Sequence, residues 1–478
     1  MLASMEAVLY PIVVDINNYL SSYILIFLLI AVGLWYSIKT RFVQVRYFGA
    51  GMKKVFGSLS LKGGAQKQGM SSFQALATAI AAQVGTGNII GASGAILTGG
   101  PGAIFWMWVI AFLGMATIYA EAVLAQETRV KDANGEVHGG PVYYIKKAFP
   151  NGFGKFLAGF FAIAITLALG FMGSMVQSNS IAEAACSAVN LDYKQWGWVI
   201  GIVIALISAF IFLGGIQRIA SVTEKHVPIM AVFFLLGGLV VLGIRVKYIP
   251  ATIAAIFKYA FTPQALLGGG LGAALKIAIS QGAKRGLFSN EAGMGSTPHA
   301  HAMANVKTPH EQGTVAMIGV FIDTFVVLTM TALVIISTLY VGEGGLIAAA
   351  DYKGAIESMG IVKTNAMQMA FSSVLPTGIS KIFVAVCLLF FAYSTIISWN
   401  FFGKINVQYL FKKNKAATVI YSVIAIVFVL LGTMLSNDLV WELTDFFNYL
   451  MVIPNAIALI ALSTVVVKSA RGAKNKKK

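Results

Sequence analysis

The sequence predicts an all-α integral membrane protein with about eleven transmembrane helices. Of its 478 residues, 58% are hydrophobic and only 11% are charged, and the mean hydropathy is +0.80. A soluble protein would carry roughly 25% charged residues, and several apolar runs here reach the ~18–20 residues that cross a bilayer. Two of these runs, around residues 81–89 and 268–293, are interrupted by glycines and polar residues. Because backbone leaves the helical ladder in a bilayer only where protein or water satisfies it, these interruptions mark special places in the fold.

The apolar runs predict the spans, and the basic residues between them predict their orientation. We expect spans at residues 19–38, 72–98, 103–126, 155–186, 196–213, 227–244, 264–288, 312–340, 377–402, 416–435 and 440–467. With this count, most of the 35 Lys and Arg residues fall on one side, which the positive-inside rule makes cytoplasmic. The C-terminus would then be cytoplasmic and the N-terminus outside. The loop with Arg245, Lys247 and Lys258 is the exception, because it falls outside.

Charge and cysteine content exclude several classes of protein. The net charge of +17 is spread over short loops between apolar spans, so it indicates topology rather than nucleic-acid binding. The two cysteines, Cys186 and Cys387, lie in apolar surroundings and imply neither a disulfide nor a metal framework. No cleavable signal peptide is evident at the N-terminus.

The eleven spans divide as one plus five plus five. Residues 1–71 would hold an extra N-terminal helix and a cytoplasmic loop, 72–263 and 264–467 two five-span halves, and 468–478 a basic cytoplasmic tail. An odd number of spans per half gives the halves opposite orientation, which is an inverted repeat. Residues 341–376 are predicted to form an external cap of short helices, and 131–148 a cytoplasmic loop with an amphipathic element.

The first interruption is the segment Gly85-Thr86-Gly87-Asn88, halfway along the second span. Two glycines one residue apart let the backbone unwind without a side-chain penalty. Unwinding frees amide groups that attract a carboxylate, and it frees carbonyl groups near Ala81 and Val84 that suit a cation. Close helix packing is the other reading of such small residues, but a Thr and an Asn at mid-membrane favour a binding site.

The second interruption is less well defined. Gln281-Gly282 is the expected unwound point facing a substrate, and Gly286 is the other candidate. The segment Asn290-Glu291-Ala292-Gly293 fits a cytoplasmic gate and a helix cap equally well.

The ninth span carries a set of neutral oxygens. Ser394 and Thr395, with the carbonyl of Phe391, lie at i, i+3 and i+4 on one helix face. This arrangement suits Na⁺, although hydroxyls that bond back to i−4 carbonyls give the same pattern. Trp399, one turn later, is on its own an interfacial or core residue.

Other polar residues inside the predicted spans are candidate functional groups. Gln177 and Asn179 are expected to contact a substrate or to link helices, and Asp323 to be paired structurally or to belong to an ion site. Glu121 and Glu183 are placed near span ends, where they would snorkel or pair. His299 and His301 lack a third metal ligand at a recognisable spacing, and Lys276 has no evident role.

Several blocks resemble the alanine/glycine:cation symporter family. They are the sixteen residues 99–114 (GGPGAIFWMWVIAFLG), with 72–76, 85–89, 139–141 and 285–293. The resemblance implies the leucine-transporter fold with one extra N-terminal helix, and Na⁺-coupled uptake of alanine or glycine by alternating access.

The same resemblance implies roles for individual residues. Thr86, Gly87 and Asn88 match the substrate-carboxylate region, Gln177 a substrate contact, and Trp399 a residue that closes the pocket from below. Ser394 and Thr395, with the carbonyls of Ala81 and Val84, match a sodium site. Ser398-Trp399-Asn400 departs from the family's usual Gly-Trp-Ser, and Lys276 from an apolar residue, so side-chain size selectivity stays open.

The sequence therefore predicts a Na⁺-coupled symporter of small amino acids in the cytoplasmic membrane, not an enzyme. Neither a phosphate-binding loop nor a Ser-His-Asp signature occurs, so an ion gradient should supply the energy. Proton coupling through Asp323 or Glu121 is the alternative, and an ion channel or an intramembrane enzyme is less favoured. The sequence ranks neither alanine against glycine nor L against D isomers, and it predicts neither the Na⁺ stoichiometry nor an oligomeric state.

Overall fold

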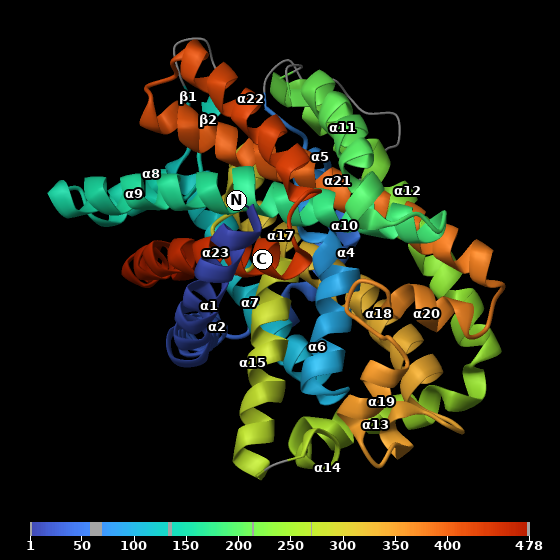
Figure 1. Cartoon of the computed structure of the whole chain (residues 1–478). Helices are drawn as coiled ribbons and strands as arrows, with labels where there is room; N and C mark the ends of the chain where they lie inside the picture. Colours follow the sequence, from blue (N-terminus) through green and yellow to red (C-terminus); the bar gives the residue numbers. More distant parts are fainter. Residues whose placement is uncertain (1, 58–68, 132–135, 213–214, 269, 476–478) are drawn as a thin grey trace.

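The computed structural model describes residues 2–57, 69–131, 136–212, 215–268 and 270–475, and most of these are helical (Figure 1). The all-α prediction is confirmed. Up to Phe261 the elements are α1 (Leu2–Tyr19), α2 (Ile26–Lys39), α3 (Val43–Arg46), α4 (Phe48–Gly57), α5 (Ser72–Gln83), α6 (Ala92–Gly99), α7 (Gly102–Thr128), β1 (Val130–Lys131), β2 (Val137–His138), α8 (Pro141–Ala148), α9 (Gly152–Ile165), α10 (Ser174–Ala188), α11 (Tyr193–Phe212), α12 (Gly215–Ile244) and α13 (Ile249–Phe261).

The rest of the chain is helical in the same way. Its elements are α14 (Gln264–Leu267), α15 (Leu271–Asn290), α16 (Pro298–Ala302), α17 (Pro309–Val320), α18 (Thr329–Ile335), α19 (Tyr352–Ser358), α20 (Ala366–Ser372), α21 (Thr377–Leu410), α22 (Lys415–Gly432), α23 (Asn437–Ala461) and α24 (Ser463–Asn475). Short π-helical turns join helices at Leu20–Leu25, Thr166–Gly173 and Phe321–Leu328 without interrupting them. Two more begin α6, at Gly87–Gly91, and end the helix that contains α18, at Ile336–Tyr340. Such turns occur frequently at functional sites.

The predicted membrane spans match the helices. In the described part of the chain, nine helices are long and apolar enough to cross a membrane, and the bent pair α5 and Gly87–Gly99 makes a tenth. The predicted span 264–288 falls on α15, which is less apolar because it carries Lys276, Lys284 and Arg285. The first helix begins earlier than expected, at Leu2 rather than near residue 19. Its polar part is accommodated, since the Asn17 side-chain amide donates to the backbone oxygen of Glu442 at 2.8 Å.

The first interruption is a real break in a span. The chain bends by 48° between α5, which ends at Gln83, and the helix that resumes at Gly87. At the other end of α5 a capping box fixes the start, because Ser71 and Gln74 each accept a hydrogen bond from the other's backbone N–H. At Gly85 a Cβ would lie 2.5 Å from Thr395 Oγ1, so only glycine lets α21 approach the break this closely.

The second break lies elsewhere than predicted. Helix α15 runs unbroken through Gln281, Gly282 and Gly286, and the chain leaves the helix only at Glu291. From there, Glu291, Gly293 and Gly295 adopt positive φ angles of 56°, 95° and 77°. The expected unwinding at 281–286 is therefore wrong. Gly282 instead allows close helix packing, because a Cβ there would lie 2.6 Å from the Cβ of Trp106 on α7.

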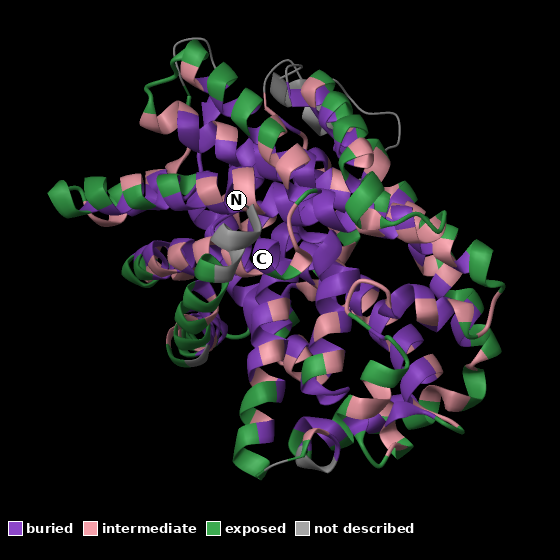
Figure 2. Cartoon of the chain, in the orientation of Figure 1, coloured by how far each residue is buried: buried purple, intermediate pink, exposed green. Residues whose placement is uncertain are grey.

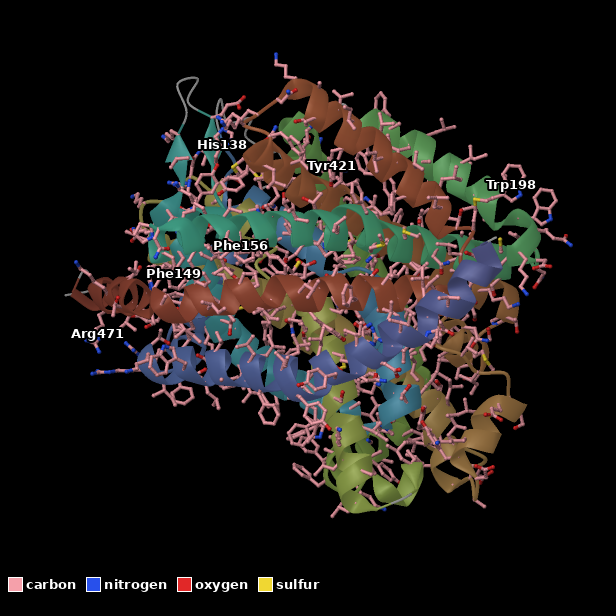
Figure 3. All side chains as sticks on the ribbon, turned by 60° about the vertical axis from the view of Figure 1, so that its left-hand side comes forward. His138, Phe149, Phe156, Trp198, Tyr421 and Arg471 are labelled. Atoms are coloured by element: carbon pink, nitrogen blue, oxygen red, sulfur yellow. The ribbon has the colours of Figure 1, made fainter. Side chains whose placement is uncertain are left out.

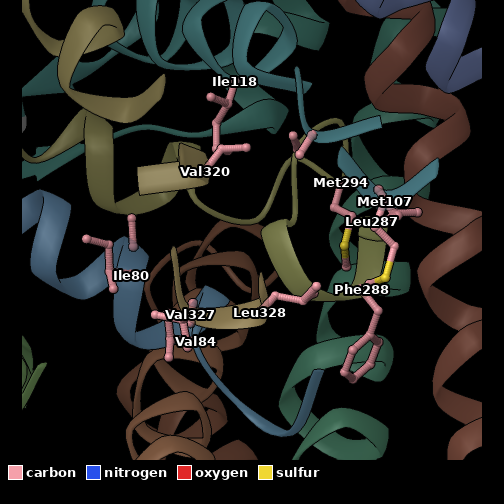
Figure 4. Close-up of a cluster of buried hydrophobic side chains, with 14 of the residues drawn as sticks. Ile80, Val84, Met107, Ile118, Leu287, Phe288, Met294, Val320, Val327 and Leu328 are labelled. Carbon is pink, nitrogen blue, oxygen red and sulfur yellow. The ribbon is translucent and has the colours of Figure 1, made fainter. Parts of the chain in front are cut away.

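The core surrounds both breaks. Figure 2 shows buried residues gathered in the centre of the molecule and exposed ones along the outer helices. Many large apolar side chains are exposed on those outer helices, as lipid-facing surfaces require. Figure 4 shows the inner cluster, to which α5, α7 and α15 contribute Ile80, Val84, Ile118, Leu287 and Phe288. The breaks are thus held by packed side chains from several helices.

Short helices occur in both segments that were predicted to lie outside the membrane. Residues 341–376 hold the short helices α19 and α20, and the Tyr352 hydroxyl donates to the carbonyl of Leu97 at 2.9 Å, at the end of α6. Residues 131–148 hold the amphipathic helix α8, with Ile145 buried and Lys146 and Lys147 exposed. The hairpin β1–β2, which pairs Val130 with His138, was not expected.

The packing role of Gly282 predicts the effect of a single methyl group. We expect Gly282→Ala to lower the unfolding free energy by roughly 1–3 kcal/mol, because the added Cβ overlaps Trp106 and the backbone of α7. Gly272→Ala is the matched control in the same helix, since nothing lies within 4 Å of its Cβ position. Thermal unfolding of the purified protein in detergent measures both. Equal melting temperatures for the two variants would contradict the packing role.

Candidate functional site

Carbonyl oxygens of the first break surround one hydroxyl of α21. Thr395 Oγ1 lies 2.9 Å from the carbonyl oxygen of Ala81, 3.0 Å from that of Phe391, and 3.5 Å from those of Ala82 and Val84. The neighbouring Ser394 Oγ lies 2.9 Å from the carbonyl of Phe391 and 3.4 Å from that of Ala81. All of these residues are buried.

This cluster holds more acceptors than donors. Four carbonyls meet two hydroxyls, and each hydroxyl carries one hydrogen. The two hydroxyl hydrogens can therefore serve only two of these oxygens at a time, whereas a hard cation, which prefers oxygen ligands, would bind several of them at once. The five residues predicted as sodium ligands, namely Ala81, Val84, Phe391, Ser394 and Thr395, are brought together here. The structure adds the carbonyl of Ala82, and it also contains the back-bond from Thr395 to Phe391 that the sequence left as an alternative.

On the other side of the break, two polar groups lack partners. The backbone N–H of Thr86 donates to Gln177 Oε1 at 3.1 Å, and that of Gly85 donates to Asn88 Oδ1 at 2.9 Å. Among the described residues, the Thr86 hydroxyl and Gln177 Nε2 are buried and have no hydrogen-bond partner. Because buried polar atoms are normally paired, a hydroxyl and an amide donor left open beside freed backbone indicate the position of a polar ligand.

Asp323 links the two breaks. Its carboxylate accepts hydrogen bonds from Asn88 Nδ2 at 2.6 Å, from Ser289 Oγ at 3.0 Å and from Thr324 Oγ1 at 2.8 Å. Asn88 belongs to the first break, and Ser289 lies two residues before the second. A second link runs from Gln83 Nε2 to the carbonyl of Asn290 at 2.7 Å. The structural role that the sequence offered for Asp323 is therefore present.

Glu121 caps the second break, so of the two expectations for it, snorkelling and pairing, pairing is observed. The residue is buried within α7, and its carboxylate accepts from the backbone N–H groups of Gly293 at 3.2 Å and Gly295 at 2.9 Å. Asn455 Nδ2 donates to the same carboxylate at 2.6 Å. Freed amide groups need acceptors inside the protein, and the carboxylate supplies them. The sequence missed this pairing because the partners lie far apart along the chain.

Glu291 ties the second break to α21. Its carboxylate accepts from the hydroxyl of Ser296 at 2.5 Å and from the indole N–H of Trp399. Of the two readings that the sequence left for residues 290–293, the cap is observed, since Glu291 ends α15 in a left-handed conformation.

Aromatic rings and an ion pair enclose the first break. The ring of Phe288 meets Trp399 edge-on at 5.8 Å and Trp441 at 4.7 Å between centroids. Arg285 lies over the Trp441 ring and pairs with Asp445, with 3.1 Å between nitrogen and oxygen. Thr86, Asn88 and Gln177 are fully buried behind these groups. Sequence reasoning assigned no role to Phe288 or Asp445, because their role depends on which helices meet.

Three predicted site residues lie outside this enclosure. Gln281 borders a cavity of about 170 Å³ that Arg285 and Trp441 also line, so it lies next to the groups that enclose the first break. Gly282 faces α7. Asn179 donates to the Tyr193 hydroxyl at 2.8 Å and to the carbonyl of Gly432 at 2.9 Å. It therefore links helices, which is the alternative that the sequence left open for it.

Other candidate groups are accounted for structurally. The Glu183 carboxylate accepts from the Thr364 hydroxyl at 2.7 Å. Asn406 contacts His299 Nε2 at 2.8 Å. Within the described ranges, no group of three or more His, Cys, Asp or Glu side chains is placed to hold a metal ion.

The chain is similar in sequence to known proteins. The family model described as "Sodium:alanine symporter family" matches residues 5–478. The chain is 39% identical to the sodium/alanine symporter AgcS of Methanococcus maripaludis, over 95% of each chain. It is also 39% identical to the putative sodium/proton-dependent alanine carrier protein YrbD of Bacillus subtilis, over 94% of this chain and 90% of that one.

A solved structure shows the fold. The crystal structure of MhsT in complex with L-phenylalanine superimposes with a TM-score of 0.60 at 14% identity, covering 85% of this chain and 97% of that one. MhsT has the leucine-transporter fold, and this chain has the same fold. The fold class implied by the family resemblance is therefore confirmed.

The cap on the second break predicts the effect of neutralising one carboxylate. We expect Glu121→Gln to lower the unfolding free energy by about 1–3 kcal/mol. The glutamine amide keeps only one acceptor oxygen, and its NH₂ group would face the N–H donors that the carboxylate now binds. Glu127→Gln removes the same charge from an exposed position on α7 and should have little effect. Denaturation monitored by tryptophan fluorescence compares the two. A loss no larger for Glu121→Gln than for Glu127→Gln would exclude the cap.

Proposed function

The chain belongs to the sodium:alanine symporter family, and we propose that it imports alanine or glycine together with Na⁺ by alternating access. The observation that carries this proposal is the oxygen cluster around Thr395, which joins the first break to α21 and has more acceptors than donors. In this proposal the structure corresponds to a closed state, since the break residues are buried from both sides.

In the proposed mechanism, Na⁺ and the amino acid share one broken span. Na⁺ binds the carbonyls of Ala81, Val84 and Phe391 with the hydroxyls of Ser394 and Thr395, and so fixes the break against α21. The fixed break presents the open Thr86 hydroxyl to the carboxylate of the amino acid. The carboxylate would also replace Asn88 and Gln177 as the acceptor of the Gly85 and Thr86 N–H groups. The open amide of Gln177 offers a further donor.

The enclosing groups account for small substrates and for gating. Phe288, Trp399 and Trp441 surround the break, so a side chain larger than a methyl group would meet aromatic rings. Opening the site on one side requires breaking the Arg285–Asp445 ion pair. Opening it on the other side requires breaking the hydrogen bond between Trp399 and Glu291. Asp323 connects both breaks, so ordering one favours ordering the other.

The proposal includes the arrangement in the membrane. Residues 72–263 and 264–467 form the two inverted halves, 1–71 contribute the additional helix, and 468–478 form a basic tail. The protein lies in the cytoplasmic membrane with the C-terminus inside and the N-terminus outside, as the loop charges favour.

Proton coupling is the second candidate. The fully buried carboxylate of Asp323 hydrogen-bonds the Asn88 side chain at the first break, where protonation would weaken the link between the breaks. One relative's name includes both sodium and proton dependence.

Uptake of labelled alanine into proteoliposomes tests the coupling ion. An inward Na⁺ gradient should drive accumulation, and a proton gradient in Na⁺-free buffer should not. Unlabelled glycine should compete, while bulky amino acids should not. Uptake that persists without Na⁺ under a proton gradient, and that is lost in Asp323→Asn, would show that the coupling ion is H⁺ and not Na⁺. Flux that fails to saturate with alanine would instead indicate a channel.

A single hydroxyl tests the sodium site. We expect Thr395→Val to raise the Na⁺ concentration for half-maximal uptake at least roughly tenfold, because a methyl group replaces one ligand at nearly constant volume. Thr331→Val is the control, since Thr331 is buried in α18 and its hydroxyl has no partner among the described residues. An unchanged Na⁺ requirement in a folded Thr395→Val protein would remove this site from the mechanism.

A further inference from the structure

A large cavity lies apart from the breaks, where the end of α2 meets the C-terminal helix. It measures about 800 Å³ and lies between the end of α2, the turn that follows it, and α24. Figure 3 shows the C-terminal helix, with Arg471 labelled near its end, beside the end of the dark blue helix α2. The lining residues are Trp35, Lys39, Thr40, Arg41, Arg46, Ser463, Thr464, Val467, Lys468, Ala470, Arg471 and Gly472. We call this cavity the basic pocket.

The basic pocket concentrates positive charge, and two of its cations contact aromatic rings, since Lys39 lies over Trp35 and Arg46 over Tyr47. Among the described residues, its lining includes five cations, Lys39, Arg41, Arg46, Lys468 and Arg471, and no carboxylate. Among the ion pairs between described residues, none involves these five side chains. Like charges held around one cavity repel each other, and an anion that enters the cavity relieves this repulsion.

The orientation of the chain in the membrane does not explain why these five cations surround one cavity. The positive-inside rule requires basic residues on one side of the membrane, but it does not require them to converge. Here, residues 39–46 and residues 468–471 meet from opposite ends of the chain. The walls are also fixed in place, since the Tyr36 hydroxyl of α2 donates to the carbonyl of Leu459 at 2.5 Å.

The turn after α2 is held in one conformation. Arg41 and Phe42 have positive φ angles of 57° and 54°, in the left-handed region that residues other than glycine rarely adopt. The N–H of Phe42 donates to the carbonyl of Ser37 at 2.6 Å, and Arg46 Nη1 donates to the carbonyl of Thr40 at 3.2 Å. The pocket is therefore preformed, so an anion would not have to order it on binding.

The surroundings of the pocket favour a lipid as the source of the anion. Trp35 lines the pocket with 40% of its surface exposed, and tryptophan is enriched where helices leave the hydrocarbon region. Leu34 and Ile38, on the same end of α2, are 43% and 63% exposed. An acyl chain can follow this apolar surface while its headgroup lies among the cations. The hydroxyls of Ser463 and Thr464 line the same pocket.

We propose that the basic pocket binds the phosphate headgroup of an anionic phospholipid on the side of the membrane that the loop charges make cytoplasmic. Arginine and lysine side chains hold the phosphate by charge-assisted hydrogen bonds, and the apolar surface of α2 receives one acyl chain. The lipid thereby joins the additional N-terminal helix to the C-terminal helix. This site is separate from the breaks, and it does not depend on the identity of the transported solute.

Lipid titrations of the purified full-length protein in detergent test the proposal. The probes are dihexanoylphosphatidylglycerol, dihexanoylphosphatidylcholine and sodium phosphate, and the measurement is the thermal unfolding midpoint. Only the phosphatidylglycerol should raise the midpoint at low concentration, and added salt should weaken the effect. Arg41→Gln with Arg471→Gln should weaken phosphatidylglycerol binding roughly 25-fold, since each cation contributes roughly fivefold. Lys146→Gln with Lys147→Gln removes equal charge outside the pocket and should not.

Other outcomes overturn the proposal. Equal stabilisation by the phosphatidylcholine would indicate a general lipid effect, and equal stabilisation by sodium phosphate a site for free anions. Equal weakening in both double variants would show a dependence on net charge alone. If the Arg41→Gln, Arg471→Gln variant does not fold, native mass spectrometry of the unaltered protein tests whether the pocket binds anionic lipid. Retention of anionic over zwitterionic phospholipid from an equal mixture supports the pocket, and equal retention contradicts it.

Discussion

The structure depends on one constraint, which is that every backbone group freed inside the membrane needs a partner from the protein. Two spans are interrupted, and the breaks are satisfied in different ways. At the first break, neutral side chains accept hydrogen bonds from the freed amide groups: Gln177 accepts from the N–H of Thr86, and Asn88 from that of Gly85. At the second, the carboxylate of Glu121 accepts from Gly293 and Gly295. A built-in anion therefore occupies the second break, whereas neutral acceptors leave the first suited to an incoming carboxylate.

The two breaks are joined by hydrogen bonds. Asp323 contacts Asn88 and Ser289, and Gln83 contacts Asn290, so the end of α15 is bonded to the first break. On the other side, Trp399 joins Glu291 to the helix that also carries Ser394 and Thr395. A cation at Thr395 and a solute at Thr86 would thus act on the same set of bonded residues. This connection gives a physical basis for coupling, because each ligand favours the arrangement that the other needs.

The basic pocket is connected to the two breaks through helices α2 and α23. Helix α2 packs along α7, which carries Glu121, and Tyr36 of α2 bonds the end of α23. Helix α23 contributes Asn455 to the cap on the second break and Asp445 to the ion pair with Arg285. The basic pocket lies where α2 and α24 meet, so a ligand there contacts helices that continue to the site.

The sequence by itself determined the helical membrane class, the spans and the first break, because hydropathy and a glycine-polar segment are local properties. It also placed Phe391, Ser394 and Thr395 on one face, since helical spacing decides that without any partner. The tertiary structure decided what the sequence could not. A glycine permits both unwinding and close packing, so only the approach of α7 shows that Gly282 packs and that the chain unwinds from Glu291. Likewise, Glu121 and Asp323 found partners on other helices, and no local pattern specifies which distant donors a buried carboxylate will meet.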